Sequence, residues 1–131
     1  MPPPELRIEV RAAGARGRGV FARVPLAKGE RIEAAPVVPI PAHQCERIAG
    51  TVLGDLPYNW GDGGEALVMG YGSFYNHSYQ PNAGYVRRYD QLTIEYVALR
   101  DIAAGEEITV NYNGTPHDRT PVWFHVDGDG V

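Results

Sequence analysis

Residues 71–82 read Tyr71-Gly72-Ser73-Phe74-Tyr75-Asn76-His77-Ser78-Tyr79-Gln80-Pro81-Asn82, which brings three tyrosine rings, one imidazole and two asparagine amides into one short segment. Asn76 and Asn82 can each brace neighbouring backbone through their amides. Pro81 favours extended backbone at the preceding residue. The His77 ring can donate at one nitrogen and accept at the other. A segment that only closes a turn does not need these groups, so we predict a functional loop.

The composition is that of one globular domain. Its 131 residues are enough for a single core, and 44% of them are hydrophobic and 21% charged. The net charge of −4 argues against nucleic-acid binding through phosphate contacts. Neither a bilayer-spanning run nor a leader is recognisable, so no membrane association is expected. The single cysteine, Cys45, excludes an internal disulfide and a multi-cysteine zinc cluster, which predicts a reducing, cytoplasmic (intracellular) setting.

The 16 glycines and 11 prolines interrupt the chain so often that short strands fit and long helices do not. Residues 42–54 are the best helix candidate, and residues 55–64 are expected to form a loop. Pro36, Pro39 and Pro41 predict an edge strand or extended connection over residues 37–40. A hairpin is expected around Asp90-Gln91. Apolar and alternating segments predict the remaining short strands, and so a mainly β fold, at 6–10, 19–22, 66–69, 85–89, 92–98 and 108–112.

A glycine-rich segment, Gly14-Ala15-Arg16-Gly17-Arg18-Gly19, lies between two predicted strands. Glycines let the backbone approach a ligand closely. No helix follows the segment, and no Gly-Lys-Ser/Thr occurs, so it is neither a dinucleotide fingerprint nor a P-loop. Taken alone, it is typical of a β-turn.

Three motifs follow one another along the chain: Gly17-x-Gly19 before Val20-Phe21-Ala22, then Asn76-His77-Ser78-x-x-Pro81-Asn82, then Gly105-Glu106-Glu107-Ile108-Thr109-Val110-Asn111-Tyr112. Their order and spacing resemble the SET-domain protein lysine methyltransferases, and more closely the short stand-alone SET proteins of bacteria and viruses. The resemblance covers roughly residues 7–112. It implies the SET-domain fold, with several short β-sheets, little helix and a knot-like C-terminal crossing. It also implies one domain over residues 1–131, with a core at about 6–114, a variable insert at about 41–70 and a tail, 115–131, that closes the site.

The resemblance implies that S-adenosyl-L-methionine donates a methyl group to the side-chain amine of lysine in a protein or peptide substrate. In the family, backbone groups matching those beside Gly17 and Gly19 hold the amino-acid end of the donor. The matching asparagine, here Asn76, fixes polar groups, and the backbone of His77 matches the position that holds the adenine edge. The expected donor-binding residues are therefore Arg16, Gly17, Arg18, Gly19, Phe74, Asn76, His77, Tyr112 and Trp123.

By the same resemblance, Tyr112 is the central catalytic residue and Tyr85 the second. A neutral amine attacks the methyl in line, so the site works mainly by alignment and by orienting polar oxygen atoms. The ammonium must first lose its proton, which desolvation in an aromatic channel favours. A tyrosine at position 85 implies mono- or dimethylation. The expected substrate channel consists of Tyr71, Tyr85, Trp123 and Phe124, and whether Trp123 covers the donor or packs on the core stays open.

The sequence departs from the family pattern at two points. Tyr79 stands where many members have cysteine or phenylalanine, and the cysteine-rich flanks that bind zinc in many eukaryotic members are absent. The short insert makes Tyr58, Asn59 and Trp60 candidates for substrate contact. The small viral members imply a homodimer that completes the substrate groove.

Other chemistries fit the sequence less well. Glu106 and Glu107 are adjacent on a predicted strand and point to opposite faces, so they do not form a glycosidase-type pair. The scattered histidines and the single cysteine predict no metal site. Two other functions stay open: a non-catalytic peptide-binding module on the same fold, and an unrelated small β-barrel whose glycine-rich turns mimic the motifs.

Overall fold

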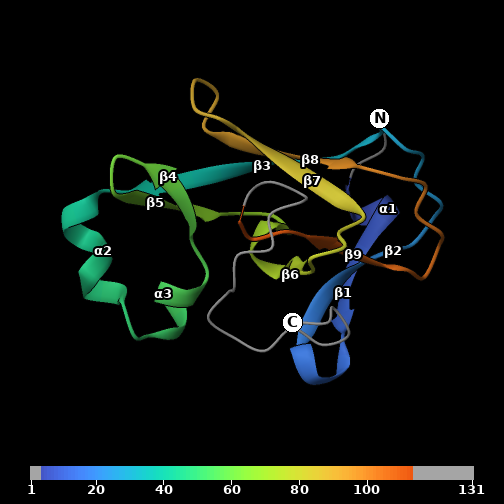
Figure 1. The fold of residues 1–131 in the computed structure, drawn as a ribbon, viewed down its shortest axis with the longest axis horizontal. Coiled ribbons are helices and arrows are strands. Elements are labelled where there is room, and N and C mark those ends of the chain that lie inside the picture. Colours follow the sequence, from blue (N-terminus) through green and yellow to red (C-terminus); the bar gives the residue numbers. More distant parts are fainter. Residues whose placement is uncertain (1–3, 114–131) are drawn as a thin grey trace.

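The computed structural model describes residues 4–113, which form two β-sheets with short helical segments (Figure 1). The chain opens with one helical turn, α1 (Pro4–Arg7). The first sheet has the order β1-β2-β9-β6. Its strands are β1 (Ile8–Ala12), β2 (Arg18–Ala22), β9 (Glu107–Val110) and β6 (Asn76–His77). This sheet therefore joins the beginning of the chain to its last described strand and to the Asn76-His77 motif.

The second sheet has the order β4-β5-β3-β8-β7. Its strands are β4 (Tyr58–Gly61), β5 (Gly64–Val68), β3 (Arg31–Ile40), β8 (Thr93–Ala98) and β7 (Ala83–Arg88). Helices α2 (Ala42–Ile48) and α3 (Val52–Asp55) lie beside β4 and β5 at the left of Figure 1. Two 3₁₀ turns, Gly14–Arg16 and Gly72–Phe74, precede β2 and β6.

The core lies between the sheets and is built by alternation along the strands. In β8, Ile94, Tyr96 and Ala98 are buried while the residues between them are half-buried. In β9, Ile108 and Val110 are buried in the same way. Burying one such aliphatic side chain contributes roughly 1.5–3 kcal/mol. The mainly β prediction is confirmed, and the 85–98 hairpin is present as β7 and β8.

Three local predictions were wrong. The strand expected from residue 6 begins at Ile8, because Pro4–Arg7 form a helical turn and the Arg7 guanidinium is buried against the carbonyls of Arg31 and Ile32. The helix expected over residues 42–54 is split into α2 and α3, and Gly50, with φ of 79°, lies in the break. The loop expected over residues 55–64 contains β4.

Strand β3 is the third of five strands in the second sheet, but its two halves pair on different sides, so residues 37–40 have a neighbouring strand on one side only, as their prolines predict. Residues 31–36 pair with β8, and residues 37–40 pair with β5. Pro39 faces Ala66 of β5, in the half where β8 is no longer alongside. A residue without an N–H is tolerated there because that stretch needs hydrogen bonds on one side only.

Candidate functional site

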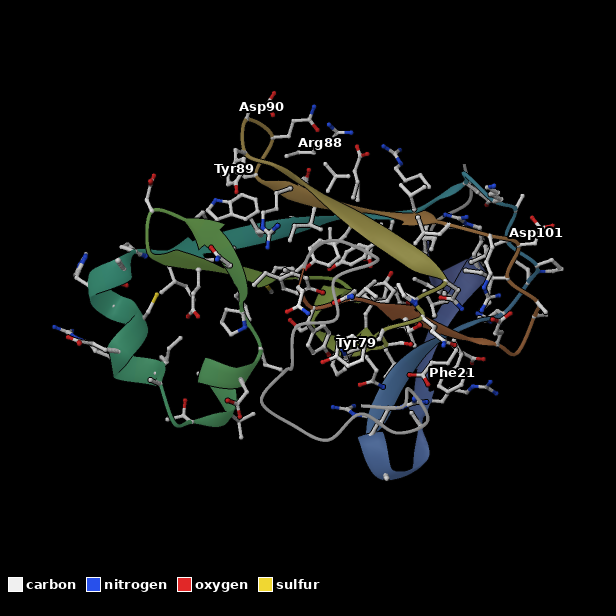
Figure 2. All side chains as sticks on the ribbon, viewed as in Figure 1. Phe21, Tyr79, Arg88, Tyr89, Asp90 and Asp101 are labelled. Atoms are coloured by element: carbon white, nitrogen blue, oxygen red, sulfur yellow. The ribbon has the colours of Figure 1, made fainter. Side chains whose placement is uncertain are left out.

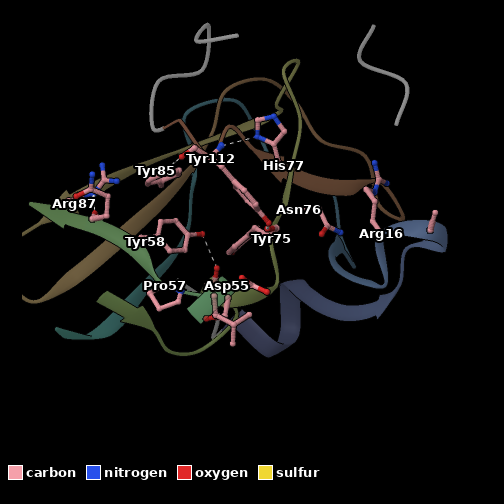
Figure 3. A pocket seen from close by; sticks show the side chains of 15 residues that line it. Arg16, Asp55, Pro57, Tyr58, Tyr75, Asn76, His77, Tyr85, Arg87 and Tyr112 are labelled. Carbon is pink, nitrogen blue, oxygen red and sulfur yellow. Dashed lines mark hydrogen bonds between the residues drawn. The ribbon is translucent and has the colours of Figure 1, made fainter. Parts of the chain in front are cut away.

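A cavity of about 650 Å³ lies where both sheets meet the Asn76-His77 motif (Figure 3). Its volume is in the range of small-molecule sites. Side chains reach it from the turn before β2, the α3–β4 connection, the segment around β6, strand β7 and the residues after β9. They include Arg16, Tyr58, Tyr75, Asn76, Tyr85 and Tyr112.

Tyr112 is held in this cavity by two hydrogen bonds to the 71–82 segment. Its backbone N–H donates to Nδ1 of His77 at 3.0 Å, and its hydroxyl donates to the carbonyl of Tyr75 at 2.6 Å. Burial, together with the nearby Tyr85 and Glu107, raises the pKa of Tyr112 to about 12. The phenol is therefore neutral at physiological pH and presents a fixed hydroxyl and ring.

A group of stacked and hydrogen-bonded tyrosines forms one wall. The Tyr85 hydroxyl donates to the carbonyl of Tyr112 at 3.3 Å, and the Tyr85 ring meets that of Tyr58 edge-on at 5.1 Å. The Tyr58 hydroxyl donates to the Gly72 carbonyl and accepts from Tyr96, both at 2.8 Å. Burial raises the pKa of Tyr85 and raises that of Tyr58 well above its ordinary value. The wall is thus aromatic and carries neutral hydroxyls.

The backbone of the 71–82 segment is anchored by a buried carboxylate and a glycine. Glu33 accepts from the Tyr75 hydroxyl at 2.8 Å and from the Tyr71 backbone N–H at 3.1 Å. Burial raises the pKa of Glu33 despite these two hydrogen bonds. At Gly72, a Cβ would collide with Val68 and approach the Tyr96 hydroxyl to 3.0 Å, so the segment packs this closely only with glycine there.

Asn76 joins the glycine-rich segment to β9. Its amide donates to the carbonyl of Arg18 at 3.1 Å and to Glu107 Oε2 at 2.7 Å, and Glu107 also pairs with Arg16. A Cβ at Gly19 would collide with Glu107 and come within 2.7 Å of the Asn76 amide nitrogen. The first, second and third sequence motifs are therefore in direct contact.

Asn82 is a positioning residue that sequence reasoning noticed without assigning a partner. It is 2% exposed, and its amide donates to the carbonyl of Glu107 and to Oε2 of Glu106. Its Oδ1 accepts from the backbone N–H of Thr109 at 2.8 Å. Glu106 and Glu107 thus have structural roles, as their adjacent positions predict.

The predicted site residues fall into three groups. Arg16, Asn76, His77, Tyr85 and Tyr112 line the cavity together. Five others are not among its lining residues: Gly17, Arg18, Gly19, Tyr71 and Phe74. Trp123 and Phe124 lie outside the described residues.

Some of the predicted residues that do not line the cavity make contacts close to it. The Arg18 guanidinium lies over the Phe74 ring at 4.9 Å, and the Tyr71 N–H binds Glu33. The ligand-binding roles assigned to all these residues stay predictions. Of the three candidates for substrate contact, Tyr58 and Asn59 line the cavity and Trp60 does not. Tyr75 also lines the cavity and was not predicted to do so.

Within residues 4–113, no group of three potential metal ligands comes together. No helix in that part of the chain is long and apolar enough to cross a membrane.

The SET domain family model matches residues 17–113. The chain belongs to the SET domain family. The match includes all three motifs and every lining residue of the cavity except Ala15 and Arg16.

Relatives of this SET domain include the H3 lysine-37-specific histone-lysine N-methyltransferase of Schizosaccharomyces pombe, which is 34% identical over 106 residues, or 80% of this chain and 72% of the relative. A candidate histone methyltransferase of Plasmodium falciparum superimposes with a TM-score of 0.66 at 30% identity, over 81% of this chain and 92% of that one. A humanized Chaetomium thermophilum Polycomb Repressive Complex 2, bound to an inhibitor, superimposes with a TM-score of 0.68 at 21% identity. That match covers 80% of this chain and 14% of the other and concerns the fold alone.

Proposed function

We propose that this protein transfers methyl groups from S-adenosyl-L-methionine to the side-chain amine of lysine in a protein substrate. It is a protein-lysine N-methyltransferase of the SET domain family. The observation that carries the proposal is the convergence of Tyr112, Tyr85 and the Asn76-His77 motif on one cavity of about 650 Å³.

The chemistry of the lining suits such a donor. The cavity combines aromatic rings with the guanidinium of Arg16, the amide of Asn76 and the imidazole of His77. Apolar walls with a few convergent polar groups are typical of small-molecule sites. Arg16, Asn76 and His77 would hold the donor, with Gly17, Arg18, Gly19, Phe74 and Trp123 as further contacts. When bound, the donor supplies an electrophilic methyl group on a sulfonium.

The tyrosine wall would receive the lysine. Tyr112 has a pKa of about 12, so only about one phenol in 10⁵ is ionised at pH 7, and it is not the base that deprotonates the amine. The hydrogen bond from its hydroxyl to the Tyr75 carbonyl fixes both oxygen atoms, so they would present an oriented polar environment to the reacting centre. The Tyr85 hydroxyl limits the room for methyl groups, which favours mono- or dimethylation.

Arg87 supplies a reason for the amine to lose its proton. Its guanidinium lines the same cavity, lies 5.5 Å from the centre of the Tyr85 ring, and is tied to the Asn59 carbonyl by a 2.6 Å hydrogen bond from Nε. A nearby cation and an aromatic, desolvating wall both lower the pKa of an ammonium group.

The Schizosaccharomyces pombe relative, named for histone H3 lysine 37, supports a histone-like basic substrate and an intracellular location. The order and spacing of the three motifs support the short stand-alone type. We further propose residues 1–131 as one domain, with residues 41–70 shaping the substrate groove, the tail 115–131 closing the site, and a homodimer as the working assembly.

Calorimetric titration with S-adenosyl-L-methionine tests the proposal. We expect the wild-type protein to bind, and the Asn76→Ala and Arg16→Gln variants to bind at least about tenfold more weakly. Gln91→Ala, on the distant hairpin turn, is the matched surface control. Thermal unfolding of each variant separates lost binding from lost folding. A folded wild-type protein that does not bind the donor refutes the proposal, and binding of lysine peptides without turnover would indicate the peptide-binding module instead.

A further inference from the structure

A second cavity, of about 640 Å³, lies at the far end of β4 and has no part in the proposed reaction. It shares no lining residue with the first cavity. Its walls come from the β4–β5 hairpin, the start of α2 with the end of β3, and the tip of the β7–β8 hairpin. The residues that give it chemical character are Trp60, Asp62, Glu65 and Tyr89.

The two aromatic rings come from different hairpins. Trp60 of β4 and Tyr89 after β7 have ring centres 4.6 Å apart and are tilted by 53°. Tyr89 is 54% exposed and projects at the hairpin tip labelled in Figure 2. Its hydroxyl lies over Gly61, where a Cβ would be 3.7 Å away. Partly exposed aromatic rings attract cations through the ring quadrupole.

The charge of the cavity has the sign that a cation needs. Asp62 and Glu65 both line it, and no lysine, arginine or histidine is among the described lining residues. Asp62 occupies the left-handed region, with φ of 51°, between two glycines that are also left-handed. Asparagine tolerates that conformation as well as aspartate does. The turn itself therefore does not require a negative charge at position 62.

We propose that this cavity binds a positively charged lysine or arginine side chain of the protein substrate, separate from the lysine that is methylated. The inference rests on the proposed function. Strand β4 joins the two cavities, since Tyr58 lines the first and Trp60 the second. An extended substrate lying alongside β4 advances by the same length per residue as the strand itself, and two to four residues span about 7–13 Å. The second basic residue of such a substrate would therefore lie about two to four positions from the lysine that is methylated.

Direct binding tests the site without any methyl transfer. The probe is Nα-acetyl-lysine methylamide, compared with its norleucine analogue, which lacks the charge, and the signal is the Trp60 indole N–H in ¹H–¹⁵N spectra of the full chain. We expect the lysine probe to shift this signal. Asp62→Asn should weaken the probe about threefold, while Asp90→Asn, the same change on the neighbouring hairpin turn, should not. Equal shifts with both probes, or equal effects of both variants, would overturn the proposal.

Methyl-transfer assays then link the site to the substrate. A peptide with two lysines three positions apart should show a KM about three- to tenfold lower than the same peptide with norleucine in place of the lysine that is not methylated. Trp60→Leu should abolish this difference in KM. Methyl transfer with no probe-induced shift of Trp60 rejects the second site alone. A Trp60 response without donor binding or methyl transfer supports the second site and rejects the proposed function.

Discussion

Tyr112 joins two distant parts of the chain through its hydroxyl and its backbone N–H, and these two contacts can be separated by mutation. Tyr112→Phe removes the hydrogen bond to the Tyr75 carbonyl and keeps the one to His77. We expect methyl transfer to fall by at least about tenfold, with a loss of about 1 kcal/mol in the free energy of unfolding. Donor binding by calorimetry should persist. Unchanged turnover would remove Tyr112 from the catalytic centre.

Arg87 leads to a prediction about the pH dependence of methyl transfer. If its charge lowers the pKa of the bound lysine, Arg87→Gln raises that pKa and moves the rising limb of the pH–rate profile to higher pH. The expected shift is about 0.5 pH units, the order of magnitude for two like charges that share a cavity open to solvent. Arg88→Gln is the matched control, because Arg88 is exposed, pairs with Glu95 and does not line the cavity. Identical profiles for the two variants would show that the lysine loses its proton without help from Arg87.

At the scale of elements, the site depends on the parallel pairing of β6 with β9, in which Asn76 faces Thr109 and His77 faces Val110. Asn82 reinforces this pairing with its buried amide. Asn82→Ala leaves the Thr109 N–H and Glu107 carbonyl without those partners, and each such buried group costs about 1–3 kcal/mol. We expect chemical denaturation to show a loss of roughly 2–5 kcal/mol. The exposed Gln91→Ala should change stability by less than about 0.5 kcal/mol.

Elements were predicted well where local pattern and tertiary packing agree. Strand β8 alternates in sequence and is half-buried in the structure, so its pattern could be read directly. Strand β4 was missed because Pro57 and the glycines at 61 and 63 look like a loop, while its pairing with β5 decides its conformation. The register of β6 against β9 is a contact between distant segments, and no local pattern encodes it.

At the scale of the whole molecule, the buried tyrosines predict a weakness in alkali. Burial raises the pKa of Tyr112 to about 12 and raises those of Tyr58, Tyr75 and Tyr96 well above 10. In the unfolded chain these phenols ionise near pH 10, while the folded chain keeps their protons. The contribution of these phenols to the free energy of unfolding is therefore constant below about pH 10 and falls above it, by up to about 1.4 kcal/mol per pH unit for each group.

Urea unfolding at pH 9, 10 and 11, with phenolate absorbance as a second signal, measures this fall. Tyr96→Phe removes one buried phenol and should reduce the slope. A free energy of unfolding that stays constant from pH 9 to pH 11 would contradict the burial of these groups.

The candidate site as a whole was predictable from sequence to the level of its motifs. The glycine-rich segment, Asn76-His77 and Tyr112 could be brought together by family resemblance, and the structure brings Arg16, Asn76, His77 and Tyr112 to one cavity. The role of Glu33 and the hydrogen-bond partner of Tyr58 could not be predicted. Each of these two residues bonds to a partner more than ten residues away in sequence, Tyr75 and Gly72 respectively, and no local pattern indicates that partner.

The sheet order β1-β2-β9-β6 has a consequence for how the protein is made. Strand β9 lies between β2 and β6, so this sheet cannot close until residues 107–110 have left the ribosome. Until then, the side of β2 that pairs with β9 stays unpaired in the hairpin of β1 and β2. Contacts between such distant segments form slowly. We therefore expect this sheet, and with it the candidate site, to be among the last parts of the domain to form.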